Sequence, residues 1–78
     1  MLNVKVLGAG CANCKRLEQA VRRVAETNGL ALDIEKVTDY EQIMTWNILQ
    51  TPGLVVADKL VAAGRIPSDA EILRLLTA

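Results

Sequence analysis

The chain contains only two cysteines, Cys11 and Cys14, and the segments on either side of them limit what it can fold into. The segment Leu2–Leu7 alternates weakly between two sets of residues, as a short β-strand does. From Lys15 to Asn28 the apolar residues recur with the period of an amphipathic helix. A C-x-x-C pair between a strand and the N-terminus of a helix is typical of redox dithiols and of some metal sites.

The composition predicts one small domain over residues 1–78 with an aliphatic core. Hydrophobic residues make up 51% of the chain, which contains no Phe, and that fraction is typical of a packed globule. Nine basic and nine acidic residues give zero net charge, so no attraction to nucleic acid or an anionic membrane is expected.

No apolar run approaches the roughly 20 residues of a membrane span, and the N-terminus does not resemble a signal peptide. We expect a monomer in the cytoplasm, where thiols are kept reduced.

The first half of the chain predicts a strand, a helix and a second strand. The helix has apolar residues at helical spacing, at Leu17, Ala20, Val21, Val24 and Ala25. Gly29 supplies the left-handed residue that ends this helix, and Leu30–Val37 follows as a strand. A connection of about 20 residues that contains a helix predicts that the two strands are parallel.

The second half predicts a short helix, a hairpin and a final helix. Thr38–Glu41 and Ser68–Glu71 both have the spacing of a capping box, so a helix is expected to start at each. Between them, Leu54–Ala57 and Leu60–Ala63 predict a hairpin with its turn at Asp58-Lys59. The predicted order of elements is therefore β-α-β-α-β-β-α.

A position just before a helix activates Cys11. The unpaired N–H groups and the positive end of the helix dipole favour its thiolate, and Lys15 adds positive charge nearby. The thiolate attacks a substrate disulfide and forms a mixed disulfide, which Cys14, one helical turn away and more buried, resolves. Gly8 and Gly10 leave the approach uncrowded and allow a sharp turn. The pair thus predicts a thiol-disulfide oxidoreductase that needs no metal or other cofactor and depends on an upstream reductase.

The same two thiolates also suit a soft ion such as Cu(I), so a metal-binding or metal-transfer module is the alternative. Soft-metal carriers of the heavy-metal-associated type share the strand, the C-x-x-C loop and the helix. They usually place Met two residues before the first cysteine, where this chain has Ala9, and they end in a strand. A third interpretation is an interaction module with a partner surface around Tyr40, Trp46 and Ile48, although such residues are more often core.

The segment Gly8–Cys14, the segment Thr51–Gly53, Gly64-Arg65 and the order of elements resemble the small thioredoxin/glutaredoxin-like proteins of archaea and bacteria, also called redox-active disulfide protein 2. The resemblance implies an α/β, thioredoxin-like three-layer fold, with a four-stranded mixed sheet and helices on both faces. It implies a cis Thr51–Pro52 bond that lies against the dithiol. The residues then expected to meet a disulfide-containing protein substrate are Gly10, Ala12, Asn13, Thr51 and Pro52.

Three positions depart from better-known relatives. Thioredoxins have Gly-Pro between the cysteines, where this chain has Ala12-Asn13, so the redox potential is not carried over. Lys5 stands where thioredoxins have a buried acid; its ammonium either reaches solvent or stabilises a thiolate from the sheet face below the dithiol. Arg65 follows Gly64 where glutaredoxins hold glutathione, and it is either a solvated loop cation or a partner for a carboxylate.

Overall fold

The chain folds into the predicted order of elements. A computed structural model describes all 78 residues. Its elements are β1 (Leu2–Leu7), α1 (Ala12–Thr27), β2 (Leu32–Val37), α2 (Tyr40–Met44), β3 (Gly53–Val56), β4 (Lys59–Ala63) and α3 (Asp69–Thr77). The order β-α-β-α-β-β-α is confirmed.

The four strands form one mixed sheet in the order β2-β1-β3-β4. The strands β1 and β2 run parallel, with Leu2 opposite Leu32 and Val6 opposite Lys36, as a crossover through α1 requires. The strand β3 pairs antiparallel with both β1 and β4. The predicted four-stranded mixed sheet is therefore confirmed.

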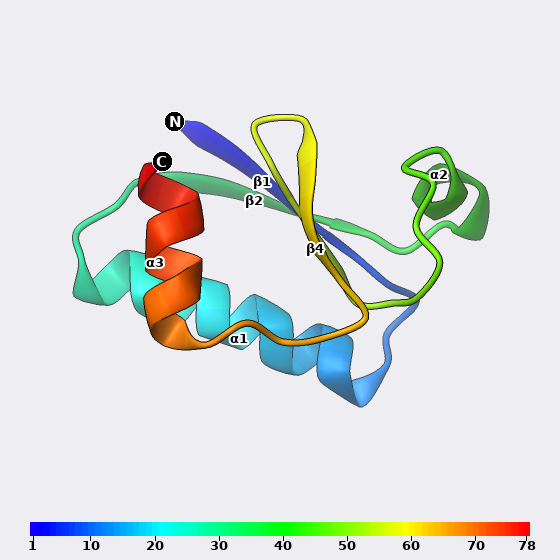
Figure 1. The fold of residues 1–78 in the computed structure, drawn as a ribbon, viewed down its shortest axis with the longest axis horizontal. Helices are drawn as coiled ribbons and strands as arrows, with labels where there is room; N and C mark the ends of the chain where they lie inside the picture. The colour runs from blue at the N-terminus through cyan, green and yellow to red at the C-terminus, as the bar shows by residue number, and fades with distance from the viewer.

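Helices cover both faces of this sheet, because β1 presents apolar side chains on each face. Val4 and Val6 pack in a larger core with α1 and α3, whereas Leu7 packs in a smaller core with Ile43 of α2. In Figure 1, α1 and α3 lie together on one side of the sheet and α2 lies apart from them at the right. This is the three-layer arrangement of the thioredoxin-like fold.

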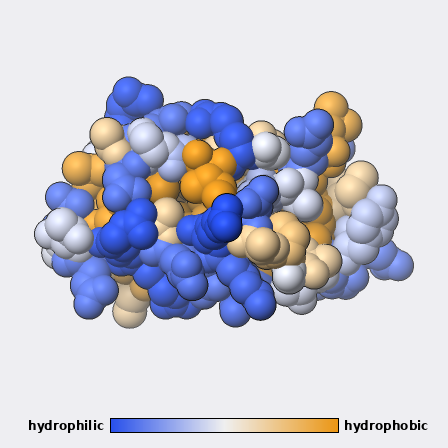
Figure 2. Space-filling view, turned by 90° about the horizontal axis from the view of Figure 1, so that it is seen from below, coloured by the Kyte–Doolittle hydropathy of each residue, from blue (hydrophilic) through white to orange (hydrophobic).

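The outer side of α1 is polar, as the single apolar stripe of this helix predicts. The buried residues of α1 are the five predicted stripe residues and Cys14. Figure 2 views the molecule from the α1 side, and hydrophilic residues predominate there, with apolar patches between them. None of the three helices has the length and hydropathy needed to span a bilayer.

The start of α2 corrects one prediction. The capping residue is Asp39 and not Thr38: a side-chain oxygen of Asp39 accepts a hydrogen bond from the backbone N–H of Glu41 at 3.2 Å. Thr38 directly follows the last residue of β2, and the helix begins only at Tyr40. The second predicted cap is confirmed, because Ser68 Oγ accepts from the Glu71 N–H at 3.2 Å.

The hairpin turn lies one residue earlier than predicted. Ala57 and Asp58 form it, with φ values of 50° and 65°, and β3 and β4 pair Val56 with Lys59. A two-residue turn with positive φ at both positions matches the right-handed twist of the strands it joins. Asp tolerates that conformation, but Ala seldom adopts it, so the residue types at this turn do not indicate its position.

We predict that Asp39→Ala lowers the free energy of unfolding by about 0.5–1 kcal/mol, because it removes the side-chain acceptor at the start of α2. Thr38→Ala is the matched control and should have a smaller effect. Urea unfolding of the two variants and the parent chain measures the difference. A larger loss of unfolding free energy in Thr38→Ala would indicate that Thr38, and not Asp39, caps the helix.

Candidate active site

The two cysteines are joined in a disulfide that spans the start of α1. Their Cα atoms lie 5.1 Å apart. Cys11 is exposed and is the residue that caps the helix, whereas Cys14 lies in the first turn with 6% of its surface exposed. The two sulfurs therefore have the predicted positions, one open to solvent and one buried.

The Cys11 sulfur takes the place of the oxygen that usually caps a helix. Its Sγ accepts a hydrogen bond from the Cys14 backbone N–H at 3.1 Å, and the N–H groups of Ala12 and Asn13 donate to no group within the chain. The first turn of α1 contains no acidic residue, unlike that of α3. When the disulfide is reduced, the unpaired N–H groups and the positive end of the helix dipole favour a thiolate at Cys11.

The two glycines before Cys11 have different roles, although the sequence suggested one shared role. Gly10 has a φ of +83°, and a Cβ at this position would meet no atom within 4 Å, so Gly10 serves the bend before the helix. Gly8 is buried, and a Cβ on it would collide with Cys14 Sγ and lie 3.9 Å from Thr51 Cβ. Gly8 therefore makes room for the buried sulfur.

The Thr51–Pro52 peptide bond is cis, as the resemblance implied. Thr51 is exposed, whereas the Pro52 ring is among the fully buried side chains. The Pro52 carbonyl accepts a hydrogen bond from the Gly64 N–H at 2.8 Å, but the backbone groups of Thr51 have no partner within the chain. Thr51, and not the proline ring, thus forms the accessible part of this segment.

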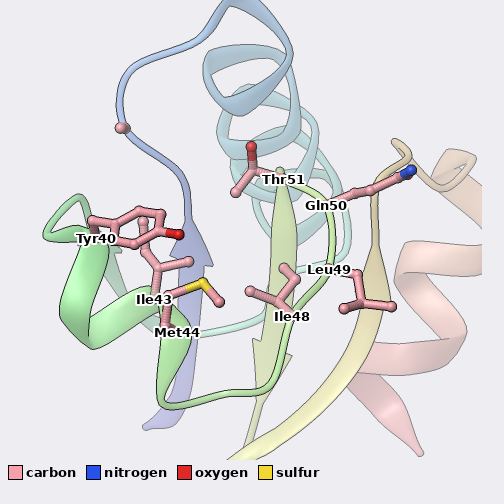
Figure 3. Close-up of a pocket in the computed structure, with 8 residues that line it drawn as sticks. Tyr40, Ile43, Met44, Ile48, Leu49, Gln50 and Thr51 are labelled. Atoms are coloured by element: carbon pink, nitrogen blue, oxygen red, sulfur yellow. The ribbon is translucent and has the colours of Figure 1, made fainter.

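An apolar groove, which the sequence pattern does not predict, begins beside this segment. Its volume is about 350 Å³, and its lining residues are Ala9, Tyr40, Ile43, Met44, Ile48, Leu49, Gln50 and Thr51. Figure 3 shows Tyr40, Ile43 and Met44 on α2, on the other side of the groove from Ile48 and Thr51 of the loop before β3. The exposed fractions are 71% for Tyr40, 42% for Met44 and 96% for Leu49, so large apolar side chains gather here in contact with solvent.

The predicted partner surface around Tyr40, Trp46 and Ile48 is therefore only partly exposed to solvent. Ile48 is 3% exposed and belongs to the smaller core, and Trp46 is partly buried against that core. Tyr40 alone of the three predicted residues is exposed. The sequence has an apolar residue at each of positions 43, 44, 48 and 49. This pattern does not indicate which of the four side chains are exposed.

A second, smaller cavity reaches Cys14 from the side of α1 and β2. Its volume is about 80 Å³, and its lining residues are Val6, Gly8, Gly10, Cys14, Lys15, Glu18, Lys36 and Thr38. The carboxylate of Glu18 lies 3.5 Å from Lys36 Nζ and 3.0 Å from Arg22. Burial raises the pKa of the Glu18 carboxyl, but the hydrogen bond from Arg22 and the charge of Lys36 outweigh it and hold that pKa below its usual value. No pattern in the sequence indicates that Glu18 or Lys36 belongs to this site.

Lys5 is not brought to the sulfurs. It is paired with Val55, which belongs to the α2-side core, so it lies on the sheet face opposite α1. Its Nζ donates to Asn3 Oδ1 at 2.6 Å and lies 3.9 Å from Asp58 Oδ1. These contacts direct the ammonium toward the start of β1, whereas the cysteines follow its end.

Arg65 is held by a carboxylate of its own chain. It donates two hydrogen bonds to Glu71, at 3.0 and 2.6 Å. These hydrogen bonds hold the pKa of the Glu71 carboxyl below its usual value. A ligand carboxylate would have to compete with this bidentate pair.

We predict that Gly8→Ala raises the reduction potential of the Cys11–Cys14 pair by about 30 mV, which corresponds to about 1.4 kcal/mol. The added methyl group displaces the Cys14 sulfur, which can rotate away in the dithiol but is fixed in the disulfide. Equilibration with a glutathione redox buffer measures the potential. Gly29→Ala is the control, because Gly29 has a positive φ and open space around it: it should lower stability without changing the potential. An unchanged potential in Gly8→Ala would contradict this role of Gly8.

Comparison with known proteins agrees with this geometry. The thioredoxin domain family model matches residues 2–77. A thioredoxin of Methanothermobacter thermautotrophicus is 34% identical over 77 residues, which cover 99% of this chain and 100% of that protein. A thioredoxin of Methanocaldococcus jannaschii is 36% identical over 72 residues, which cover 92% of this chain and 83% of that protein. The solved structure of thioredoxin-2, a component of malaria parasite protein secretion machinery, superposes with a TM-score of 0.70 at 13% identity, over 99% of this chain and 82% of that one, which shows a shared fold. The chain belongs to the thioredoxin family.

Proposed function

We propose that this protein reduces or exchanges disulfides in protein substrates, with Cys11 as the nucleophile and Cys14 as the resolving thiol. Membership of the thioredoxin family supports thiol-disulfide oxidoreductase chemistry in general. The observation that carries the specific roles is the contrast between the two sulfurs. Cys11 is exposed at the N-terminus of α1, whereas Cys14 is 6% exposed behind it. Only the first can meet a large substrate.

The proposed reaction has two exchange steps. The Cys11 thiolate attacks one sulfur of the substrate disulfide; a bond forms between them, and the other substrate sulfur leaves as a thiolate that takes a proton from water. Cys14 then loses its proton and attacks the Cys11 sulfur, which releases the second substrate thiol and forms the Cys11–Cys14 disulfide. Two electrons pass from the dithiol to the substrate, and the dithiol itself carries them without a metal or other cofactor. An upstream reductase must return two electrons to the pair, in a reducing compartment such as the cytoplasm.

The substrate segment is proposed to bind in extended form beside Cys11. The unpaired backbone N–H and C=O of Thr51 can hydrogen-bond to such a segment, as in the addition of a strand to a sheet. Gly10, Ala12 and Asn13 are exposed around Cys11 and would border the segment on the other side. The apolar groove that starts at Ala9 and Thr51 is then in reach of a neighbouring substrate side chain.

The order of elements supports this chemistry over soft-metal transfer. Carriers of the heavy-metal-associated type end in a strand, but this chain ends in α3, whose residues Ile72 and Leu76 are part of the larger core. The Thr51–Pro52 segment has no role in such a carrier, whereas here Thr51 lies beside Gly8 and the dithiol.

We predict that Cys11→Ser abolishes reduction of insulin disulfides by the dithiothreitol-regenerated protein. Cys14→Ser should instead accumulate a mixed disulfide at Cys11, because the resolving thiol is absent. Turbidity measures the reduction, and mass spectrometry under non-reducing conditions measures the mixed disulfide. The proposal is wrong if Cys11 of the reduced parent protein alkylates no faster at neutral pH than a free-cysteine peptide. Copper bound at stoichiometric amounts after purification, together with no reductase activity, would favour the metal alternative.

We also predict that Leu49→Ser raises the KM for a protein disulfide substrate about fivefold, since loss of part of a buried leucine contact corresponds to about 1 kcal/mol. Reduction of a small aliphatic disulfide should not change, because such a substrate does not reach the groove. Leu49→Met is the control, since it keeps an apolar side chain of similar volume, and its KM should match the parent value. Equal effects of Leu49→Ser on both substrates would argue against the groove as a substrate contact.

A further inference from the structure

We infer that Glu18 accepts the proton of the Cys14 thiol, through water in the cavity beside Cys14, when Cys14 resolves the mixed disulfide. This inference rests on the proposed function, in which Cys14 is the resolving thiol. It assigns a role to a carboxylate that lies one helical turn after the second cysteine and outside the C-x-x-C motif.

Cys14 needs an acceptor for its proton, and the protein core supplies none. Cys14 is 6% exposed, and the buried residues around it include no polar or charged side chain. Burial disfavours a charged thiolate. A thiol in this position therefore loses its proton efficiently only if a base can be reached from it.

The cavity of about 80 Å³ provides a route to one. Cys14, Gly8 and Gly10 form part of its wall, and the two glycines have no side chains that would separate the cavity from Cys14. A water molecule needs about 10–15 Å³ of such space and two or more polar partners. Thr38 and Glu18 provide such partners within the same lining.

Glu18 is the only carboxylate that lines this cavity. It follows Cys14 by four residues on α1, and side chains at that spacing are neighbours on a helix, with Cβ atoms about 5–6 Å apart. Its side chain is 15% exposed, compared with 61% for Lys36 and 56% for Arg22, which bind it from β2 and from the next turn of α1. The carboxylate is thus fixed in position, at the boundary between the cavity and solvent.

The charges that face Glu18 explain how it would be reset after each turnover. Arg22 and Lys36 contact its carboxylate, and Lys15 faces the same cavity. Arg22 and Lys36 favour the ionised form of Glu18, so a proton taken up from Cys14 passes on to solvent. The position of the buried thioredoxin acid does not supply the acceptor in this chain, because Lys5 occupies it and lies on the opposite face of the sheet.

The resolving step moves one proton and one electron pair away from Cys14. The Cys14 S–H bond breaks, and its proton moves through water to a Glu18 oxygen. The Cys14 sulfur uses the electron pair of that bond to attack the Cys11 sulfur. The bond between Cys11 and the substrate breaks, and its electron pair leaves with the substrate sulfur as a thiolate, which solvent protonates.

The test follows the reactions of Cys11 and Cys14 as two successive kinetic phases. The reduced protein is mixed in a stopped-flow instrument with the aromatic disulfide that releases thionitrobenzoate. Attack by Cys11 releases the first equivalent, and attack by Cys14 on the resulting mixed disulfide releases the second. Glu18→Gln should slow the second phase at neutral pH about tenfold or more, as expected for loss of a positioned base, and leave the first phase within about twofold.

The pH profile distinguishes a proton acceptor from a structural residue. In Glu18→Gln the second phase should rise about tenfold per pH unit, because hydroxide replaces the missing base, and approach the parent rate at high pH. Added formate should accelerate the second phase of Glu18→Gln and not that of the parent protein. Glu26→Gln, two turns later on the exposed side of α1, is the control and should leave both phases unchanged.

The outcomes separate this inference from the proposed function. If the parent protein releases two equivalents and Glu18→Gln releases the second with unchanged rate and pH profile, Glu18 is not the acceptor and the proposed function stands. A parallel loss of both phases in Glu18→Gln also overturns the inference, because it indicates a structural effect. If the parent protein releases only one equivalent, Cys14 does not resolve, and the proposed function fails with the inference.

Discussion

The close approach of the Cys14 sulfur to Gly8 is the constraint on which the rest of the site depends. It joins the end of β1 to the first turn of α1, and Thr51 Cβ lies 3.9 Å from the position that a Cβ on the same glycine would take. Any side chain at position 8 would occupy the space of the sulfur, so the absence of one lets the end of β1, the first turn of α1 and the distant loop at Thr51 meet. The order of strands also brings these segments together. Because β1 lies between β2 and β3, the segment after β2 and the segment before β3 both lie next to the end of β1.

This arrangement exposes one cysteine and buries the other, and the proposed roles of the two sulfurs rest on that difference. Cys11 is exposed at the helix end and accepts a hydrogen bond from the Cys14 N–H, while Cys14 itself is only 6% exposed. In other helices of this protein an oxygen takes the capping role, from Asp39 in α2 and from Ser68 in α3. A sulfur in that position is polarised by the same N–H groups and dipole that an oxygen would satisfy. The local rule that starts a helix therefore also favours a thiolate at Cys11, the proposed nucleophile.

Much of this could be predicted from the sequence, because periodicity and spacing record local geometry. The order of elements, the parallel pairing of β1 and β2, the Ser68 cap and the unequal burial of the cysteines are all confirmed. The cis bond came from family resemblance. The turn at Ala57-Asp58 could not be predicted, since Ala is a poor residue for positive φ, and Asp39 displaced the Thr38 cap although both have suitable side chains. The groove and the Cys14 cavity depend on how α1 and α2 pack on the sheet, and no local pattern records that.

The position of Lys5 in the sequence, six residues before Cys11, does not determine whether its side chain reaches the cysteines; the face of the sheet on which it lies does. Side chains alternate along a strand, and Gly8 faces Cys14, so position 6 shares the α1 face and position 5 does not. Val6 is paired in register with Lys36 on β2, which places Lys36 on that same face, where its Nζ meets Glu18. A charge that acts on the buried sulfur from this side must therefore come from β2 or from α1 itself. In this chain both elements supply one, and they bind each other at the mouth of the cavity that leads to Cys14.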